Sequence, residues 1–409
     1  MRRISPDTKP LVVVLVGLPA RGKTYIGRKI ARYLSWLGYS TRVFNIGEYR
    51  RERLGTHLRQ DWFDVTHAEG SAARSEMAQA ALADLLAFLK GGGDVGIYDA
   101  TNATRARRDE VAERCTSKGC QVVFVESICE DPTLIEANIR ETKLRSPDYA
   151  GVDPEEAVRD FRARIDHCAR IYEPIQDDPL SYIKLIDFGR LMVVHRIHGH
   201  VPGKIVSFLM NLHLVRRPVW LTRHGESEFN REGRIGGDPD LTADGDKYAR
   251  VLAYFVREKS VTPPVIWCST LRRAVQTTRH MPLRALQWRA LDEIDAGTCD
   301  GMTYDEIEAQ LPKEYADRAA DKLNYRYPRG ESYADVIQRL EPVIIETERQ
   351  TSPVLIVAHL AVLRALYAYF TDQKPEECLT MEVPFNTVIE LKPGPYGFDE
   401  RRHVLDLNG

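Results

Sequence analysis

Along the first half of the chain, continuous apolar runs alternate with segments whose apolar residues recur at helical spacing. Residues 11–18 form a continuous apolar, β-branched run, which is typical of a parallel strand buried on both faces. Apolar residues then recur at helical spacing up to Gly38, a residue that suits a helix end. Further strands are predicted at 41–47, 95–100, 121–127 and 181–189, and helices at 71–93 and 130–144. This alternation predicts a parallel sheet with helices on both faces.

The pattern changes near residues 200–218, where Pro202 and Gly203 precede a short apolar segment. A new strand is predicted from Val219, and buried strands follow at 263–270 and 352–360. Long polar and helical stretches lie between these strands. Because 409 residues are too many for one ordinary core, we expect two α/β domains, residues 1–214 and 215–409.

The composition indicates a globular protein without a charge bias. Lys and Arg number 57 and Asp and Glu 59, so the net charge of −2 argues against nucleic-acid binding. The apolar run at 11–20 is too short to span a bilayer, and residues 1–10 lack a signal core. The seven cysteines form no CxxC motif, which indicates free thiols in a reducing compartment. We therefore expect a cytoplasmic protein with neither a nucleic-acid nor a membrane partner.

A phosphate-binding motif lies in the first half. Residues 17–24, GLPARGKT, fit G-x-x-x-x-G-K-[ST] between a predicted strand and a predicted helix. Backbone N–H groups of such a loop bind phosphates, while Lys23 would reach the β and γ phosphates and Thr24 would ligate Mg²⁺. Asp99 ends a strand, where it could hold Mg²⁺ or accept a proton from a substrate hydroxyl. The alternatives are a glycine-rich turn without a ligand, and a capping role for Asp99, Thr101 and Asn102.

A different phosphate chemistry is indicated in the second half. His224 follows an apolar strand and is flanked by Arg223 and Gly225, as suits a nucleophile that takes a phosphoryl group. Such a transfer requires cations around the oxygens and an acid for the leaving alkoxide. The candidates for these roles are Arg272, Arg273, Glu293, His359 and Arg364. A structural histidine is the alternative, but four phosphate-type elements in one half favour catalysis without a metal.

Taken together, the two motifs and their surroundings resemble the bifunctional 6-phosphofructo-2-kinase/fructose-2,6-bisphosphatase family over nearly the whole chain. The matching segments follow the family's order and include GLPARGKTY, VFNIGEYRRE, DATNATRARR, KLRSPDY, RHGESEFNREGRIGGD, EIDAG and YRYPRGESY. The resemblance implies an N-terminal P-loop kinase-like domain and a C-terminal histidine-phosphatase domain of the phosphoglycerate mutase-like kind. One would make fructose 2,6-bisphosphate from fructose 6-phosphate and ATP. The other would hydrolyse it through a phosphohistidine, which would set the level of a regulator of glycolysis and gluconeogenesis.

The resemblance implies specific roles in the kinase half. The residues implied to bind ATP are Gly17, Leu18, Pro19, Ala20, Arg21, Gly22, Lys23, Thr24, Tyr25, Asn138 and Lys143. Those implied to bind fructose 6-phosphate are Arg50, Arg74, Thr101, Arg107, Lys143 and Arg164. Asp99 matches the family's active-site carboxylate and Cys129 a cysteine of its kinase site, with Mg²⁺ held at Thr24 and Asp99.

In the phosphatase half, His224 would carry the phosphoryl group from C2, and Glu293 would protonate the C2 oxygen and then activate water. The residues implied to surround the phosphoryl group are Arg223, Asn230, Gly236, Arg273 and His359. Those implied to hold the sugar and its 6-phosphate are Tyr304, Arg318, Lys322, Tyr333 and Arg364. Charge pairing at this second phosphate would distinguish a bisphosphate from a monophosphate.

The sequence departs from the family's pattern at a few positions. Leu360 and Glu48 each stand where the family typically has glutamine, Cys168 where it has tyrosine, and Glu130 where it has asparagine. The alternatives are therefore a chain with one active half, such as a sugar-phosphate phosphatase with a nucleotide-sensing domain, a non-enzymatic nucleotide sensor, or a mutase-like activity in the second half. Retention of the catalytic residues disfavours the sensor, and residues 317–333 favour the bisphosphate over the mutase substrate. The family expectation for assembly is a homodimer.

Overall fold

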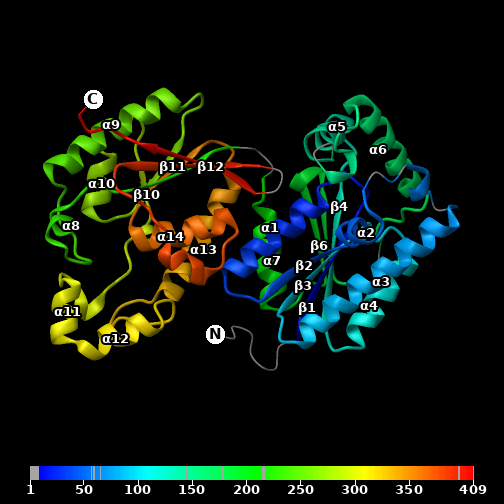
Figure 1. The fold of residues 1–409 in the computed structure, drawn as a ribbon, viewed down its shortest axis with the longest axis horizontal. Helices are drawn as coiled ribbons and strands as arrows, with labels where there is room; N and C mark the ends of the chain where they lie inside the picture. Colours follow the sequence, from blue (N-terminus) through cyan, green and yellow to red (C-terminus); the bar gives the residue numbers. More distant parts are fainter. Residues whose placement is uncertain are drawn as a thin grey trace. The chain divides into compact units, whose positions relative to one another are not determined.

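The structure, a computed structural model, describes residues 9–56, 58, 60–64, 66–143, 146–176, 179–213, 217–394 and 397–408. The side chains of residues 60, 61, 142, 143 and 188 also lie outside this description. The chain divides into two compact units, Met1–Leu212 and His213–Gly409. Within the described residues each unit contains one six-stranded sheet with helices packed over it (Figure 1). The α/β architecture predicted for both halves is confirmed.

The sheet of unit 1 has the strand order β2-β3-β1-β4-β5-β6. Its first five strands in chain order pair in parallel, and β6 pairs antiparallel with β5 at one edge. The strands are β1 (Leu11–Val16), β2 (Thr41–Asn45), β3 (Val95–Asp99), β4 (Gln121–Ile128), β5 (Tyr182–Ile186) and β6 (Leu191–His195). The helices are α1 (Lys23–Trp36), α2 (Ile46–Leu54), α3 (Ala68–Lys90), α4 (Arg105–Thr116), α5 (Pro132–Asn138), α6 (Pro154–Ala169) and α7 (His200–Met210). Short turns of helix occur at η1 (Gln60–Phe63), η2 (Ile139–Lys143), η3 (Pro147–Tyr149) and η4 (Asp187–Gly189).

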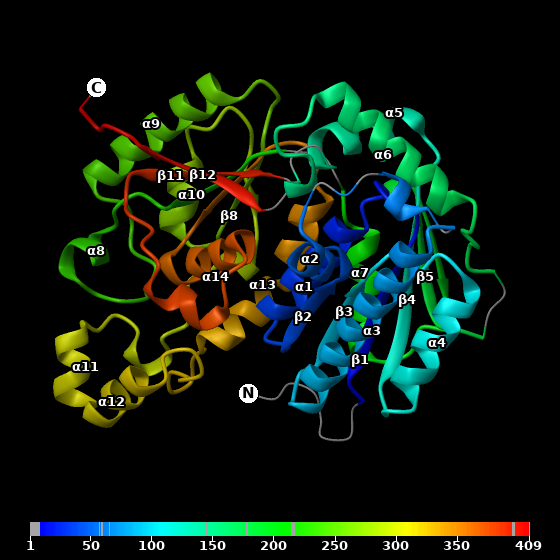
Figure 2. The same cartoon turned by 45° about the vertical axis from the view of Figure 1, so that its right-hand side comes forward.

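Strand β1 is buried along its whole length, because helices of unit 1 cover both faces of the sheet. Alternate strand residues face opposite sides of the sheet. Val12, Val14 and Val16 share a core with side chains of α3 and α4, whereas Leu15 packs against Gly27 of α1. Figure 2 shows α3 and α4 together on one side of this sheet. The prediction that the continuous apolar run forms a strand buried on both faces is therefore confirmed.

Several boundaries in unit 1 differ from the sequence prediction: the strand expected at 181–189 ends at Ile186, and the helix expected at 71–93 spans Ala68–Lys90. The second strand was expected to reach residue 47, but it ends at Asn45, whose side chain accepts a hydrogen bond from the Glu48 backbone N–H at 3.1 Å and caps α2. The helix expected at 130–144 begins at Pro132 and changes to a π-helical turn at Ile139. The antiparallel edge strand β6 had no counterpart in the prediction. Local capping chemistry thus decides where these elements end.

The sheet of unit 2 has the order β12-β11-β7-β10-β8-β9, with β11 antiparallel to β7 and β12 antiparallel to β11. Its strands are β7 (Val219–Arg223), β8 (Val265–Cys268), β9 (Leu286–Gln287), β10 (Val354–Ala358), β11 (Thr387–Pro393) and β12 (Phe398–Val404). Its helices are α8 (Glu228–Glu232), α9 (Ala243–Lys259), α10 (Arg272–Thr278), α11 (Tyr304–Gln310), α12 (Pro312–Ala320), α13 (Tyr333–Arg349) and α14 (Leu360–Thr371). Short 3₁₀ turns are η5 (Arg289–Leu291), η6 (Gly297–Cys299) and η7 (Pro375–Thr380).

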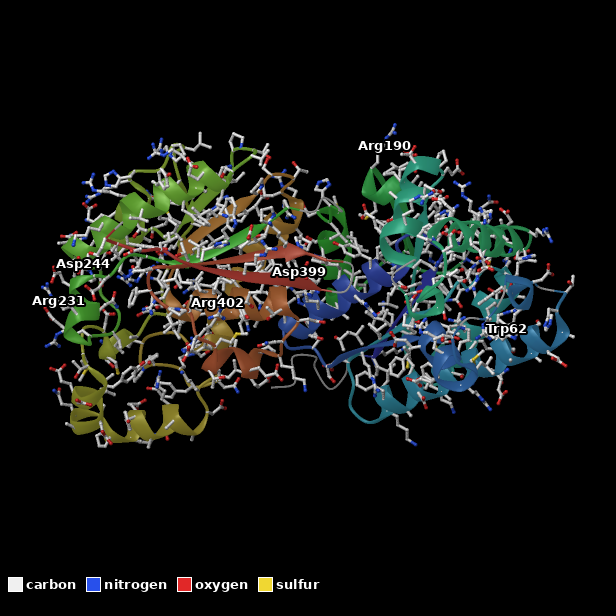
Figure 3. The ribbon with its side chains drawn as sticks, turned by 45° about the horizontal axis from the view of Figure 1, so that its top comes forward. Trp62, Arg190, Arg231, Asp244, Asp399 and Arg402 are labelled. Atoms are coloured by element: carbon white, nitrogen blue, oxygen red, sulfur yellow. The ribbon has the colours of Figure 1, made fainter. Side chains whose placement is uncertain are left out.

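The centre of this second sheet positions the candidate catalytic residues. Strands β7, β10 and β8 are parallel neighbours, so their carboxyl ends meet at one edge. At the outer edge, β12 carries charged side chains such as Asp399 and Arg402, which suits a strand with one unpaired side (Figure 3). Among the described helices, none is both long and apolar enough to cross a membrane.

Candidate active sites

The phosphate loop of unit 1 joins the end of β1 to the start of α1. Gly17 has a φ of 136° and lies against the backbone of Ser127, so that a Cβ there would stand 2.4 Å from the Ser127 carbonyl oxygen. Gly22 caps α1 with a φ of 77°. The Lys23 ammonium donates to the Leu18 carbonyl at 2.7 Å, across the loop. Only glycine permits this backbone course, and the resulting loop leads into a helix N-terminus that favours anions.

Contacts from neighbouring strands and helices hold the loop in place. The Gly17 N–H donates to the Thr101 carbonyl at 3.1 Å, and the Ser127 hydroxyl donates to the Arg21 carbonyl. The Asn138 side chain donates to the Ala20 carbonyl at 3.3 Å. The structure therefore brings to the loop both Asn138, which the resemblance implied for ATP, and Thr101, which it implied for fructose 6-phosphate. Tyr25 lies in the first turn of α1, and the side chain of Lys143 lies outside the described residues.

Asp99 stands at the carboxyl end of β3, buried and hydrogen-bonded to the side-chain amide of Asn45. The described residues contain no cluster of three or more His, Cys, Asp or Glu that would bind a metal unaided. Mg²⁺ in phosphate-transfer sites is ordinarily held by one or two carboxylates together with substrate phosphates. One buried carboxylate at a strand end, with the Thr24 hydroxyl at the start of α1, therefore fits that ion.

Cys129 follows β4 and is buried. Burial raises the pKa of its thiol, and the positive charge of Arg21 nearby lowers it only in part. A thiolate is the nucleophilic form of cysteine. Cys129 is therefore a neutral thiol in this state, in keeping with the absence of any sequence signal for a reactive cysteine.

Three of the arginines implied for sugar-phosphate binding gather around η1. The Arg50 and Arg164 guanidinium groups lie 5.4 Å and 4.1 Å from the centroid of the Phe63 ring. The Arg74 guanidinium lies 5.2 Å from the Trp62 ring, which in turn contacts Phe63 edge-on. Cations stacked on aromatic faces retain outward-pointing N–H donors for an anion. We call Arg50, Arg74 and Arg164 the η1 arginine cluster.

Acidic partners already engage part of this cluster. Arg50 forms an ion pair with Asp148, and the Arg164 Nε donates to Asp160 at 2.8 Å. Arg107 differs, because its described hydrogen bonds go to the Tyr98 hydroxyl at 2.8 Å and to Glu110 at 2.6 Å. Three of the implied arginines thus lie together at η1. The side chain of Arg107 instead contacts residues of α4 and β3.

Two of the three departures in unit 1, Glu48 and Cys168, occupy different places. The Glu48 carboxylate lies 3.4 Å from the Arg28 guanidinium, and its side chain is 49% exposed. Cys168 is half-buried on α6. Burial raises the pKa of its thiol, and the positive charges of Lys23 and Arg74 offset this rise only in part. Cys168 therefore lies within electrostatic reach of both the phosphate loop and the η1 arginine cluster.

The nucleophile candidate of unit 2 is His224, directly after β7. Its Nδ1 lies 2.6 Å from the Gly225 carbonyl oxygen, so Nδ1 carries the proton and Nε2 keeps the lone pair. The Arg273 Nε donates to that Nε2 at 3.2 Å. Burial, followed by the charge of Arg273, holds the pKa of His224 well below 6.5. A buried neutral imidazole with a defined lone pair is the reactive form for attack on phosphorus.

Further cations surround His224. Burial lowers the pKa of Arg223 to about 10, and its guanidinium stacks on the Phe385 ring at 3.6 Å from the centroid. The Arg273 Nη1 donates to the Gly237 carbonyl at 2.7 Å, next to Gly236, which has a φ of 68°. These cations lack a carboxylate within bonding distance in the described contacts, so the pocket keeps a net positive charge that favours a phosphoryl group.

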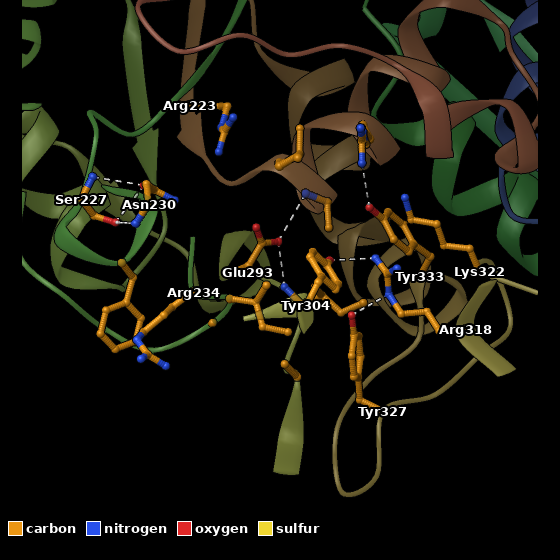
Figure 4. A pocket seen from close by; sticks show the side chains of 18 of the residues that line it. Arg223, Ser227, Asn230, Arg234, Glu293, Tyr304, Arg318, Lys322, Tyr327 and Tyr333 are labelled. Atoms are coloured by element: carbon orange, nitrogen blue, oxygen red, sulfur yellow. Dashed lines mark hydrogen bonds between the residues drawn. The ribbon is translucent and has the colours of Figure 1, made fainter. Parts of the chain in front are cut away.

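Glu293 and His359 complete the pocket. The Glu293 Oε1 accepts hydrogen bonds from the Ile294 N–H at 2.9 Å and the Ala361 N–H at 3.3 Å (Figure 4). His359 precedes α14, and its ring centroid lies 4.9 Å from that of His224. The structure therefore brings together residues that are spread over more than a hundred positions in the sequence.

A single cavity of about 600 Å³ connects this pocket with a second group of cations. The Arg318 guanidinium donates to the hydroxyls of Tyr327 and Tyr304 at 2.8 Å and 2.9 Å (Figure 4). The Arg364 Nη1 donates to the Tyr333 hydroxyl at 3.4 Å. Burial, then the charges of Arg364 and Arg318, lowers the pKa of Lys322 to about 8. We call Arg318, Lys322 and Arg364 the distal cation cluster.

All phosphatase-half residues implied by the resemblance line this cavity except His359, which packs behind His224. Leu360 also lines it, so this departure faces the candidate substrate. Sequence reasoning missed the lining residues Ser227, Phe229, Arg234, Ile235, Ile294, Ala296, Tyr315, Ala319, Tyr327 and Ala361. Tyr327 lies in the segment YRYPRGESY, which supports the family resemblance, but the resemblance implied no role for Tyr327 itself.

Comparisons with known proteins match both units. Residues 2–216 match the family model of 6-phosphofructo-2-kinase, and residues 219–405 match that of the histidine phosphatase superfamily, branch 1. A 6-phosphofructo-2-kinase/fructose-2,6-bisphosphatase from Caenorhabditis elegans is 46% identical over 97% of this chain and 90% of its own length. The chain belongs to the 6-phosphofructo-2-kinase/fructose-2,6-bisphosphatase family. The resemblance predicted from the motifs is therefore confirmed.

Other members of the family show the same breadth of similarity. The Arabidopsis thaliana 6-phosphofructo-2-kinase/fructose-2,6-bisphosphatase is 50% identical over 98% of this chain, which spans about half (54%) of that relative's length. The Homo sapiens 6-phosphofructo-2-kinase/fructose-2,6-bisphosphatase 4 is 46% identical over 95% of this chain and 83% of its own. Among solved structures, the alpha-ribazole phosphatase from Shigella flexneri is 25% identical, with a TM-score of 0.41 over 46% of this chain and 95% of its own.

Proposed function

We propose that this chain is a bifunctional enzyme that both makes and destroys fructose 2,6-bisphosphate. Unit 1 transfers the γ-phosphoryl group of ATP to the 2-hydroxyl of fructose 6-phosphate, and unit 2 hydrolyses the product to fructose 6-phosphate and phosphate. Family membership supports both activities. The observation that carries the proposal is the single cavity joining the His224 pocket to the distal cation cluster, because a bisphosphate needs two separate anion sites.

In unit 1, backbone N–H groups of residues 20–24 hold the ATP phosphates, and Lys23 leaves the Leu18 carbonyl to pair with them. Bound Mg²⁺ supplies charge neutralisation on the phosphate oxygens, with Thr24 and Asp99 as its protein ligands. The η1 arginine cluster binds the 6-phosphate of the sugar, with Arg107 and Lys143 as further cations. Thr101, at the loop, contacts the sugar. These placements follow the family pattern and the contacts described above.

In unit 2, the His224 Nε2 attacks the phosphorus on C2, and the bond from phosphorus to the C2 oxygen breaks. Glu293 gives its proton to that oxygen, which restores the 2-hydroxyl of fructose 6-phosphate. Arg273, which contacts Nε2 in the free protein, moves to the phosphoryl oxygens, where Arg223, Asn230 and the Gly236 backbone also bind. Glu293 then takes a proton from water, whose oxygen attacks the phosphohistidine. Phosphate leaves and the imidazole regains its lone pair.

The distal cation cluster selects the substrate. Its cations bind the 6-phosphate of the bisphosphate, and the hydroxyls of Tyr304 and Tyr333 lie beside them. A substrate without that phosphate leaves partly buried cations uncompensated, which weakens its binding. We also propose a cytoplasmic homodimer with neither a nucleic-acid nor a membrane partner. Its support is the family pattern, the net charge of −2 and the seven free cysteines.

The test uses His224→Ala, in which the destruction of product is blocked. The variant is incubated with Mg-ATP and fructose 6-phosphate, and an acid-labile sugar bisphosphate is sought. Accumulation of this product, with its hydrolysis by wild type through an acid-labile phosphoenzyme, is the expected result. The control Lys23→Met should form none. If His224→Ala binds ATP yet forms no bisphosphate, the kinase half of the proposal is wrong and unit 1 is a nucleotide-binding domain.

A further inference from the structure

The segment that carries Glu293 has no regular secondary structure. It runs from the short turn η5 to the next turn, η6, so no sheet or helix ladder fixes its backbone. The Glu293 Oε1 accepts from the Ile294 and Ala361 N–H groups at 2.9 Å and 3.3 Å. Among the described residues these are the hydrogen bonds of this carboxyl group, so Oε2 is the oxygen that carries the proton for the leaving alkoxide. The position of Oε2 therefore depends on what holds the segment.

One arginine of α13 holds the carbonyl groups of this segment. The Arg339 Nη2 donates to the carbonyl oxygens of Asp292 and Glu293 at 2.7 Å and 3.2 Å. The Arg339 Nη1 donates to the Ala290 carbonyl. A planar guanidinium reaches several acceptors at fixed angles, whereas an ammonium is a compact point charge. Arg339 does not line the cavity, so it contacts the main chain that carries the acid and not the substrate.

Glu331 fixes this guanidinium in turn. Its Oε1 accepts from the Arg339 Nε at 2.8 Å, and its Oε2 accepts from the Nη2 at 3.0 Å. The two side chains are 23% and 24% exposed, so the pair is largely shielded from solvent. Two-point pairs between ionised groups are stronger and better oriented than single contacts. Glu331 therefore sets the direction in which Arg339 presents its other donors.

The same glutamate ties the acid segment to the distal cation cluster. The Asp295 N–H donates to the Glu331 Oε2 at 3.1 Å, and the Glu331 N–H donates to the Asp295 carbonyl at 2.9 Å. Glu331 lies between Tyr327 and Tyr333, whose hydroxyls accept from arginines of that cluster (Figure 4). The segment that carries the acid and the segment that contacts the second anion site are therefore joined at a fixed spacing.

We propose that Arg339 and Glu331 are positioning residues for the phosphatase reaction. They hold Glu293 so that its proton meets the C2 oxygen when the 6-phosphate occupies the distal cation cluster. The bond from phosphorus to the C2 oxygen breaks as the bond to the His224 Nε2 forms, and the proton of the Glu293 Oε2 passes to the C2 oxygen. This inference rests on the function proposed for unit 2. It assigns a role to an ion pair that lines no part of the cavity.

The first test is a double-mutant cycle on the rate of phosphoenzyme formation, measured by rapid quench with a radiolabel in the 2-phosphate of fructose 2,6-bisphosphate. Arg339→Lys keeps the charge but loses the planar fork, and should slow this rate by about 10- to 100-fold, with KM changed by less than about threefold. Glu293→Gln should lose about 100-fold or more, because the acid is absent. Added to Glu293→Gln, Arg339→Lys should cost less than about threefold more. Full additivity of the two losses would overturn the proposal.

The matched control is Arg349→Lys, at a two-point pair with Glu346 on the same helix. It should change neither the rate of phosphoenzyme formation nor KM. A second measurement is amide hydrogen exchange of the whole protein, followed by mass spectrometry. Exchange in residues 290–296 should become about tenfold faster in Arg339→Lys and stay unchanged in Arg349→Lys, because only the former releases the segment. Unchanged exchange in Arg339→Lys would also contradict the proposal.

Two safeguards separate the outcomes. If Arg339→Lys fails to fold, as judged by thermal melting, Glu331→Gln replaces it, since an amide keeps the size of the side chain but loses the ionic pair. If wild type forms no phosphoenzyme from fructose 2,6-bisphosphate, the proposed function of unit 2 is wrong. The exchange measurement then decides without any activity whether Arg339 and Glu331 hold the segment of Glu293.

Discussion

The two units build phosphate sites from opposite materials. In unit 1 the backbone forms the loop, since Gly17 and Gly22 adopt left-handed or otherwise glycine-specific conformations that lead the chain into the N-terminus of α1. In unit 2 side chains form the pocket, and Arg223, Arg273 and Glu293 come from three separate segments. A backbone site is contiguous in sequence, whereas a side-chain site depends on parallel strands that bring distant residues to one edge. The backbone site should therefore tolerate substitutions at positions other than its glycines and its lysine. The side-chain site should lose function when any of its pocket side chains is replaced.

The two sites also differ in how their cations are neutralised. In unit 1, Arg50 and Arg164 have carboxylate partners in Asp148 and Asp160. In unit 2, burial and mutual repulsion lower the pKa of Arg223 to about 10 and that of Lys322 to about 8. Unit 2 is therefore an uncompensated cation pocket that requires anions, while the arginines of unit 1 must exchange partners to bind one. Anion binding in unit 2 should depend more strongly on pH and salt.

The largest expected effect separates the two chemistries. His224→Ala removes the nucleophile and should lower bisphosphatase activity by about 1,000-fold or more, with kinase activity kept within about twofold. Lys23→Met should do the reverse, because the loss of one phosphate-binding charge costs about 100- to 1,000-fold in phosphoryl transfer. Both activities are measured on each purified variant. A variant that lost both activities while keeping its thermal melt would contradict the independence of the two sites.

The next effect tests the backbone nature of the first site. Gly17→Ala places a Cβ 2.4 Å from the Ser127 carbonyl oxygen at a φ of 136°, so the loop must distort, at a cost of about 2 kcal/mol. ATP binding by calorimetry should fall at least tenfold, while bisphosphatase activity stays. The matched control is Gly203→Ala in α7, where nothing lies within 4 Å of the added Cβ and stability should be unchanged or slightly higher.

A third effect concerns the geometry of the distal cation cluster. Arg318→Lys keeps the charge but cannot donate to both Tyr304 and Tyr327, so we expect KM for the bisphosphate to rise by about tenfold, with kcat nearly constant. Steady-state kinetics measures this. The control Arg231→Lys, at an exposed ion pair with Glu228, should change neither constant. A fall in kcat alone would show that Arg318 acts in the chemical step and not in binding.

Much of this organisation could be predicted from the sequence, for physical reasons that differ between the units. The phosphate loop was visible because a glycine-rich strand–helix turn permits few residues. The alternation of buried runs and helical periodicity identified β1, α1, α3 and β4 to within a few residues. The antiparallel edge strands β6 and β12 escaped because they are short or rich in charge, as in FDERRHV. The inner antiparallel strand β11, between β12 and β7, also escaped.

The supporting residues of unit 2 could not be predicted in the same way. Arg339 and Glu331 are ordinary charged residues within a helix and just before it, and only the fold shows that they hold the segment of Glu293. Phe385 likewise gains its role from a stack on Arg223. Sequence spacing identifies groups that react, while long-range packing decides which groups hold them in place.

A smaller effect follows from the pKa of Lys322, about 8 in the free protein. Burial and its cationic neighbours lower this pKa, so Lys322 loses its proton as the pH rises through about 8, and with it the attraction for the 6-phosphate. KM for the bisphosphate should rise severalfold between about pH 7 and 9. Lys322→Arg should abolish this rise, because an arginine stays charged. An unchanged slope in that variant would assign the pH dependence to another group.

The smallest effect is expected at Glu48, which adds a carboxylate to unit 1 where the family typically has glutamine. Its side chain is half-exposed and faces Arg28, 3.4 Å away, while the neighbouring Arg50 is buried and paired with Asp148. A solvent-screened charge with its own partner contributes little to a site built by other residues. Glu48→Gln should therefore change KM for fructose 6-phosphate by less than about twofold. A larger gain in affinity, measured beside Glu76→Gln at the exposed pair with Arg53, would show that Glu48 repels the sugar phosphate and that unit 1 is also governed by side-chain charge.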